Sequence, residues 1–127
     1  MEASEQAFRF ASDSRAAAAA REAVRSAAGD LPREVLSDVL LCVTELVTNT
    51  VSHPETERDE ELELSVARTP QALRVEVAER DRGVFVETAK RAPGDPAFGL
   101  YIVELLSDRW GVERGERRRI WFEKDLN

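Results

Sequence analysis

The sequence is poor in the residues that most often cross-link a small protein or hold a metal in it. Its 127 residues include one cysteine, one histidine and one methionine. The single cysteine, Cys42, excludes an intrachain disulfide and favours a reducing compartment. The single histidine, His53, has no second histidine or cysteine cluster with which to share a metal such as zinc.

Long apolar runs and excess positive charge are also missing. No apolar stretch approaches the roughly 20 residues that a membrane span requires. The opening segment, MEASEQAFRF, lacks the basic and then apolar order of a secretory signal. Eighteen basic residues stand against 25 acidic ones, a formal charge of −7, whereas a nucleic-acid-binding domain needs a basic surface. We therefore expect a cytoplasmic protein that binds neither a membrane nor nucleic acid directly.

The length and the apolar content are sufficient for one folded domain. Apolar residues make up 43% of the chain, and a domain of this size buries roughly two-thirds of its unfolded surface. No internal repeat or long linker divides the sequence, so residues 1–127 are expected to form a single domain. Cys42 lies in an apolar run and is expected to be a small core residue.

An alanine-rich segment predicts the first helix. Residues 16–20 are all alanine, the strongest helix former. Asp13 or Ser14 is placed to cap the start of this helix, and Gly29 is placed to end it. A structural helix is the simpler interpretation, although the small side chains would also allow a partner or a second copy of the chain to pack closely.

The segment LPREVLSDVLLCVTELVTNTVSHP predicts a long central helix. Its apolar residues recur at helical spacing over about five turns, with Pro32 suited to the first turn and Pro54 closing the segment. Glu45 and Asn49 are four residues apart, so they share one face at the edge of the apolar stripe. In a cleft, the Asn carbonyl could ligate Mg²⁺ and the Glu could orient or deprotonate a hydroxyl. Taken alone, the pattern is better explained by a solvated helix flank.

Alternating apolar residues predict the strands. ELELSVAR and ALRVEVAE alternate as two strands of a hairpin, and residues 110–113 and 118–124 read as two closing strands around Gly115. Residues 80–96 lack periodicity, and helical spacing resumes in FGLYIVELL. Gly99, near the start of that helix, would let a ligand approach the free N–H groups that favour phosphate. The order β, α, α, β, β, α, β, β predicts an α+β two-layer sandwich, with the helices on one face of a mainly antiparallel sheet.

Four segments together resemble the GHKL ATPase superfamily: ELVTNTVSH, VEVAERDRG, AFGLYIVELLSDRWGV and RIWFE. They look most like the small anti-sigma-factor serine kinases and the related stand-alone ATP-binding regulators of actinobacteria. The resemblance extends from about Phe8 to Leu126. It implies the Bergerat ATP-binding fold, with ATP and Mg²⁺ as ligands. It also implies two protein partners that link the chain to transcription: a sigma factor, and a small antagonist phosphorylated on serine or threonine.

The resemblance also assigns roles to individual residues. Asn49 matches the residue that holds Mg²⁺ against the phosphates, and Glu45 matches the acid that activates the attacking hydroxyl. Residues 81–96 match the ATP lid. The remaining nucleotide-binding positions match His53, Glu79, Asp81, Gly83, Phe98, Gly99 and Leu100. From the residues alone, His53 is better explained as a cap at the end of the central helix, where a cation suits the helix dipole.

The glycine boxes depart from the family pattern. Where D-x-G-x-G is usual, this chain has Glu79 and Asp81 and retains only Gly83, and Ala97 replaces the first glycine of the last box. Glu79 is one methylene longer than the Asp that bonds the adenine amino group in the family. Two functions remain open. The intact pair on the central helix favours an ATP-dependent protein serine/threonine kinase that sequesters a sigma factor. The departures favour a catalytically silent module that acts by protein contact.

The charge distribution carries one further expectation. Four arginines follow or precede the last turn, and they predict a solvated basic rim: Arg114, Arg117, Arg118 and Arg119. The acidic remainder suits a basic, DNA-binding protein partner, since opposite net charges speed encounter.

Overall fold

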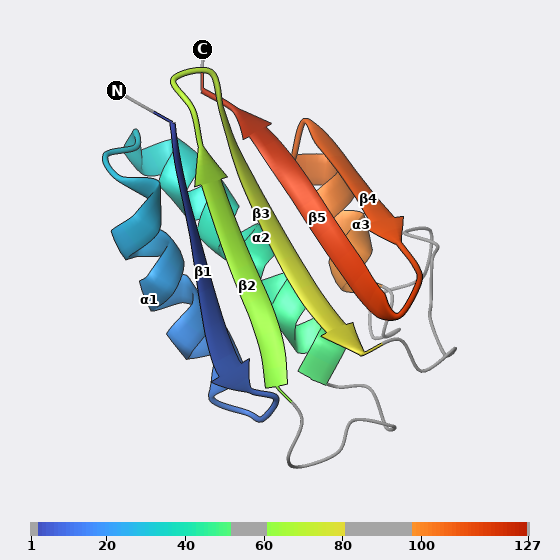
Figure 1. Cartoon of the computed structure of the whole chain (residues 1–127). Coiled ribbons are helices and arrows are strands. Elements are labelled where there is room, and N and C mark those ends of the chain that lie inside the picture. The colour runs from blue at the N-terminus through green and yellow to red at the C-terminus, as the bar shows by residue number, and fades with distance from the viewer. Residues whose placement is uncertain (1–2, 52–60, 81–97, 127) are drawn as a thin grey trace.

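The computed structural model describes residues 3–51, 61–80 and 98–126 (Figure 1). The elements, in chain order, are β1 (Ser4–Ala11), α1 (Ala16–Ala28), α2 (Arg33–Val51), β2 (Glu61–Arg68), β3 (Ala72–Arg80), α3 (Phe98–Leu106), β4 (Arg109–Glu113) and β5 (Arg117–Asp125). The strands form one antiparallel sheet in the order β1-β2-β3-β5-β4. The helices cover one face of it, as Figure 1 shows. The predicted α+β two-layer sandwich is confirmed.

The two faces of the sheet differ because the strands alternate apolar and polar residues. The apolar side chains point toward the helices and are at most 1% exposed; they include Leu62, Leu64, Val66, Leu73, Val75, Val77, Ile120 and Phe122. Each such burial contributes roughly 1.5–3 kcal/mol relative to exposure. Trp110 is partly buried and packs against this core.

Helix α2 supplies the other half of the core. Its buried residues follow the helical period and are 0–1% exposed: Val39, Cys42, Val43, Leu46 and Val47. The expectation that Cys42 is a core residue is therefore confirmed. The first intrahelical bond runs from the Leu36 N–H to the Pro32 carbonyl at 2.9 Å, so Pro32 stands immediately before α2 and the proline ring costs the helix no hydrogen bond.

Helix α1 uses its small side chains to pack inward. Ala16, Ala20, Ala27 and Ala28 are buried together with Val24, so most of the alanine face is covered by the rest of this chain. The predicted caps are half right. Gly29 ends the helix with φ 74°, a conformation that suits glycine, but Arg15 occupies the N-cap position.

The reason lies in how the chain enters α1. The Asp13 carboxylate accepts a hydrogen bond from the Arg15 N–H at 2.8 Å, and the Asp13 carbonyl accepts one from the Ala16 N–H at 3.1 Å. Asp13 therefore closes a turn that precedes the helix. Its carboxylate bonds to the Arg15 N–H instead of capping the first turn of α1.

On the other face of the sheet, Trp121 lies against the backbone of the edge strand β4. Gly111 stands opposite Trp121 in the register, and the Arg74 guanidinium stacks on the Trp121 ring, 4.2 Å from its centroid. Arg74 also forms ion pairs with Glu76 at 3.3 Å and Glu123 at 3.1 Å. The indole fits this close to the strand because Gly111 has no Cβ.

Adding that Cβ tests the arrangement. In Gly111→Ala the new methyl group would lie 2.8 Å from Cζ2 of Trp121, so we expect a loss of about 1–3 kcal/mol in the free energy of unfolding in urea. Gly115→Ala is the control, because nothing lies within 4 Å of its added Cβ. Equal stabilities of the two variants would contradict this packing.

Candidate functional site

Helix α2 has two flanks, and each is tied to a different helix. On one flank, the Thr44 hydroxyl accepts a hydrogen bond from the Arg21 guanidinium of α1 at 3.1 Å. On the other, Asp38 forms an ion pair with Lys124 of β5, with 3.5 Å between Oδ2 and Nζ. The Lys124 ammonium also donates to the Leu106 carbonyl at the end of α3, at 2.7 Å. The Asp38 flank is therefore the α3 side of α2.

Glu45 and Asn49 lie along this α3 side. Asp38, Glu45 and Asn49 are separated by seven and four residues, spacings that return to the same face of a helix. Both Glu45 and Asn49 are half-buried. Within the described residues, Glu45 has neither a hydrogen-bond nor an ion-pair partner.

Helix α3 brings its start to the same region. Its last residue, Leu106, is held near Asp38 by Lys124, so α3 runs back along α2 toward Asn49. The helix has nine residues, a length of roughly 13 Å, which places Phe98 and Gly99 toward the C-terminal end of α2. Leu100 is fully buried and anchors this first turn. The first N–H groups of a helix have no intrahelical partner and suit an anion.

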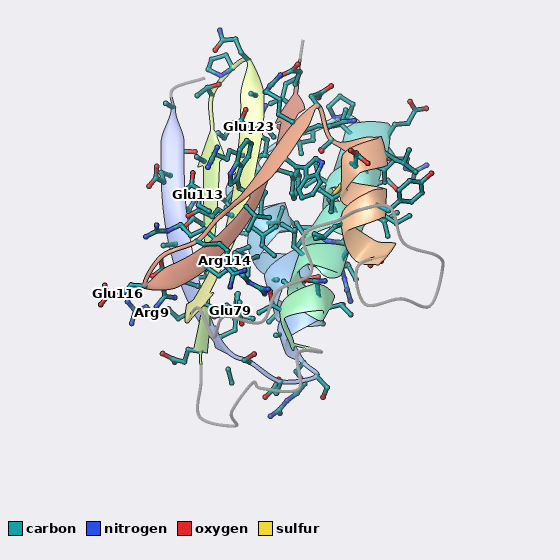
Figure 2. All side chains as sticks on the ribbon, turned by 90° about the vertical axis from the view of Figure 1, so that its right-hand side faces the viewer. Arg9, Glu79, Glu113, Arg114, Glu116 and Glu123 are labelled. Atoms are coloured by element: carbon teal, nitrogen blue, oxygen red, sulfur yellow. The ribbon has the colours of Figure 1, made fainter. Side chains whose placement is uncertain are left out.

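The end of β3 lies at the same end of the molecule as the end of α2 (Figure 1). Glu79, the second-to-last residue of this strand, points to the helix side of the sheet, as Val75 and Val77 do. It forms an ion pair with Arg118, its register partner on β5. Glu79 is 7% exposed and Arg118 is 3% exposed. Figure 2 shows Glu79 near one end of the sheet and Glu123 near the other.

This pair corrects the expected basic rim. Arg114, Arg117 and Arg119 are exposed, but Arg118 is buried and neutralises Glu79. Removing one partner of such a pair typically costs about 3–5 kcal/mol, because the other charge is left buried. The alternation of apolar and polar residues in β5 indicated this burial, because Arg118 shares the inward phase of Ile120 and Phe122.

The other expected site residues divide into two groups. Glu45, Asn49, Glu79 and Leu100 are described with their side chains, and Phe98 and Gly99 form the first residues of α3. Three expected nucleotide contacts and the expected lid lie outside the described residues: His53, Asp81, Gly83 and residues 81–96.

The donor set at this end fits Mg²⁺ with a phosphate ligand. The Asn49 carboxamide offers a hard oxygen, of the kind Mg²⁺ accepts, and the start of α3 offers N–H groups to phosphate. The described residues contain no cluster of three His, Cys, Asp or Glu side chains that could hold a metal. A cation beside Asn49 would therefore draw further oxygen ligands from a phosphate and from water.

Comparison with known proteins identifies the class. The sequence pattern of the histidine kinase-like ATPase domain matches residues 10–124, which is nearly the whole chain. The protein belongs to this family of ATPase domains. A comparison with curated proteins found no match.

A solved structure supports the fold. The crystal structure of the RsbU and RsbW domains of Rv1364c from Mycobacterium tuberculosis is similar to this chain with a TM-score of 0.70 and 16% sequence identity. The similarity covers 97% of this chain and 32% of that chain, so this chain spans about a third of its relative.

None of the helices in the described residues is both long and apolar enough to cross a membrane.

The thiol of Cys42 gives a pH test of the α2 core. Burial, and next the charge of Asp38, raise the pKa of Cys42 to about 12 from an ordinary value of 9.0. Above pH 9 the unfolded chain has lost this proton while the folded chain retains it. Stability should therefore fall as pH rises, by about 1.4 kcal/mol per pH unit until about pH 12.

The measurement is urea unfolding of the wild-type protein and of Cys42→Ala between pH 8 and 11. Subtracting the variant removes the contributions of other groups that titrate in this range. The stability difference between the two proteins should stay constant below pH 9 and shift against the wild type above it. Parallel pH profiles would show that the thiol is not held protonated in the fold.

Proposed function

We propose that this chain binds ATP with Mg²⁺ between α2 and α3 and transfers the γ-phosphoryl group to a serine or threonine of a protein partner. The observation that carries the proposal is the placement of Glu45 and Asn49. Both are half-buried on the α3 side of α2, at the end where α3 begins and β3 ends. Membership of the histidine kinase-like ATPase family supports the choice of nucleotide.

Each residue has a distinct role in this proposal. Bound ATP with Mg²⁺ supplies the phosphoryl group to be transferred. The Asn49 side-chain carbonyl holds the cation, and the N–H groups at Phe98, Gly99 and Leu100 face the phosphates. The Glu45 carboxylate takes the proton of the partner's hydroxyl as that oxygen bonds to the γ-phosphorus and the bond to the β-phosphate oxygen breaks. His53, Asp81 and Gly83 complete the nucleotide contacts.

The proposed partners are a sigma factor, which the chain sequesters in the cytoplasm, and a small antagonist protein, which it phosphorylates. Support comes from the similarity to a structure that contains an RsbW domain and from the net charge of −7, which suits a basic, DNA-binding protein. A homodimer is proposed as the second type of assembly, through the exposed remainder of α1.

A second candidate function rests on Glu79. Its carboxylate is paired with Arg118 in the interior, at the position where the family pattern has the Asp that bonds the adenine amino group. A chain that binds nucleotide poorly could still regulate a partner by contact alone. This silent binding module and the kinase differ in whether Glu45 and Asn49 are needed.

Substitutions at those two residues separate the functions. If the kinase proposal is right, Asn49→Ala should abolish the Mg²⁺-dependent part of ATP binding, measured by calorimetry with and without Mg²⁺. Glu45→Gln should retain binding but lose phosphoryl transfer to the partner by about 10²–10⁴-fold, the usual contribution of a general base. Glu34→Gln, an exposed glutamate in the first turn of the same helix, is the control and should behave as the wild type.

The partner proposal has its own test. Affinity capture with the intact chain from a cytoplasmic extract should recover a sigma factor or a small antagonist protein. The association rate of the purified pair should fall as salt is raised, since opposite charges steer the encounter. Recovery of DNA alone, persisting at moderate salt, would reject this proposal.

A further inference from the structure

Strand β1 is an open edge of the sheet. Among the described strands it pairs with β2 alone, and Figure 1 shows its other side at the margin of the sheet. The strand has eight residues and contains neither proline nor lysine, which natural edge strands often use to block further pairing. The opposite edge strand, β4, has only five residues. The backbone groups along the open side of β1 are therefore placed to pair with another strand.

The side chains of β1 alternate between the two faces of the sheet. Phe8 and Phe10 pack against the core on the helix side. Arg9 lies on the other face, as Figure 2 shows, and forms an ion pair with Glu63 of β2 at 3.4 Å. Glu5 shares the face of Arg9, and within the described residues it has no hydrogen-bond or ion-pair partner. The open edge therefore carries an exposed carboxylate and, four residues later, a guanidinium side chain that is 71% exposed.

These two charges make β1 complementary to a second copy of itself. When two identical strands pair about a two-fold axis that crosses the sheet, only residues of the same face stand opposite each other. With the axis at Ala7, Glu5 of each copy stands opposite Arg9 of the other, so two ion pairs form. An axis at Gln6 or Phe8 places an alanine opposite every charge, and an axis at Glu5 or Arg9 opposes like charges.

We propose that two copies of this chain join through their β1 strands, antiparallel and in the register centred on Ala7, to form one continuous sheet. On the helix side, each Phe8 then lies opposite Gln6 of the second copy and diagonal to its Phe8, a separation that aromatic side chains can bridge. Helix α1 lies behind the same edge of the sheet (Figure 1), so its exposed remainder stands next to this interface. The inference rests on the homodimer of the proposed function and names the surface that joins it.

Charge reversal tests the register. In Glu5→Arg, arginines oppose each other at both pairs, and in Arg9→Glu, glutamates do. Each variant alone should raise the dimer dissociation constant, measured by analytical ultracentrifugation, by about tenfold or more, because two attractions become two repulsions. An equimolar mixture of the two variants should form a heterodimer with an affinity within about threefold of the wild type, since each arginine then faces a glutamate.

Overall charge does not explain that recovery. Each reversal changes the formal charge of −7 by two units, so both variants remain acidic and repel each other at long range. Glu113→Arg is the matched control, because Glu113 is an exposed residue of the opposite edge strand. It makes the same change in charge as Glu5→Arg and should leave the dissociation constant unchanged.

A cross-link tests the position of the axis. Opposite residues of an antiparallel pair have Cα atoms roughly 4.5–5.5 Å apart, which a disulfide can span. Ala7→Cys should therefore give a disulfide-linked dimer on mild oxidation, detected on a non-reducing gel. Ala11→Cys is the control, because Ala11 is exposed on the same face of β1, whereas its two copies would lie roughly 27 Å apart. The natural Cys42 is 1% exposed and does not compete.

The outcomes are distinguishable. A dimer that neither charge reversal weakens, or an Ala7→Cys variant that cross-links no better than Ala11→Cys, overturns the β1 interface and leaves the proposed homodimer standing. A wild-type chain that stays monomeric at about 100 µM overturns the homodimer and this inference together. Either result leaves ATP binding and phosphoryl transfer to their own test.

Discussion

The burial of one face of the sheet beneath α2 is the constraint on which the rest of the structure depends. An antiparallel sheet with one apolar face needs a cover, and the wide apolar stripe of α2 fills the centre of that layer. The geometry of the helix then determines which residues of α2 face α1 and which face α3. Thr44 meets α1, and Asp38 meets Lys124 beside α3. Glu45 and Asn49 fall on the second flank because they share the helical phase of Asp38, and this leaves two polar groups facing the start of another helix.

Local periodicity was enough to predict the elements and the face shared by Glu45 and Asn49, because both follow from spacing along one segment. It could not predict features that depend on a distant or competing partner. Arg15 takes the N-cap of α1 because the Asp13 carboxylate is already bonded to the Arg15 N–H. Arg118 has the inward phase of Ile120 and Phe122, but its charge is tolerated there because Glu79 lies opposite it on β3. The pairing of β3 with β5 brings these two residues together, and no local pattern specifies it.

The two faces of the sheet differ in how deeply their ion pairs are buried. On the helix side, Glu79 and Arg118 form a buried ion pair. The geometry of a buried pair decides whether the attraction between the charges repays their desolvation. On the other face, Arg74 and Arg109 share Glu123, and the hydrogen bond from Arg109 is the largest cause of the lowered pKa of that carboxyl. Exposed pairs of this kind contribute little individually. Arg74 also stacks on Trp121, so part of the indole is covered by a neutralised guanidinium and not by a second layer of helices.

The strand order also has a consequence for how the chain folds. The central strand of the sheet, β3, pairs with β5, and residues 81–116, with α3 and β4 among them, lie between the two strands in sequence. Pairing them requires a long loop to close before any ladder hydrogen bond forms, and such non-local pairings slow folding. Because α3 lies within that segment, the proposed nucleotide, if it binds at the start of α3, would bind only the chain in which the sheet is complete and would thereby stabilise the fold.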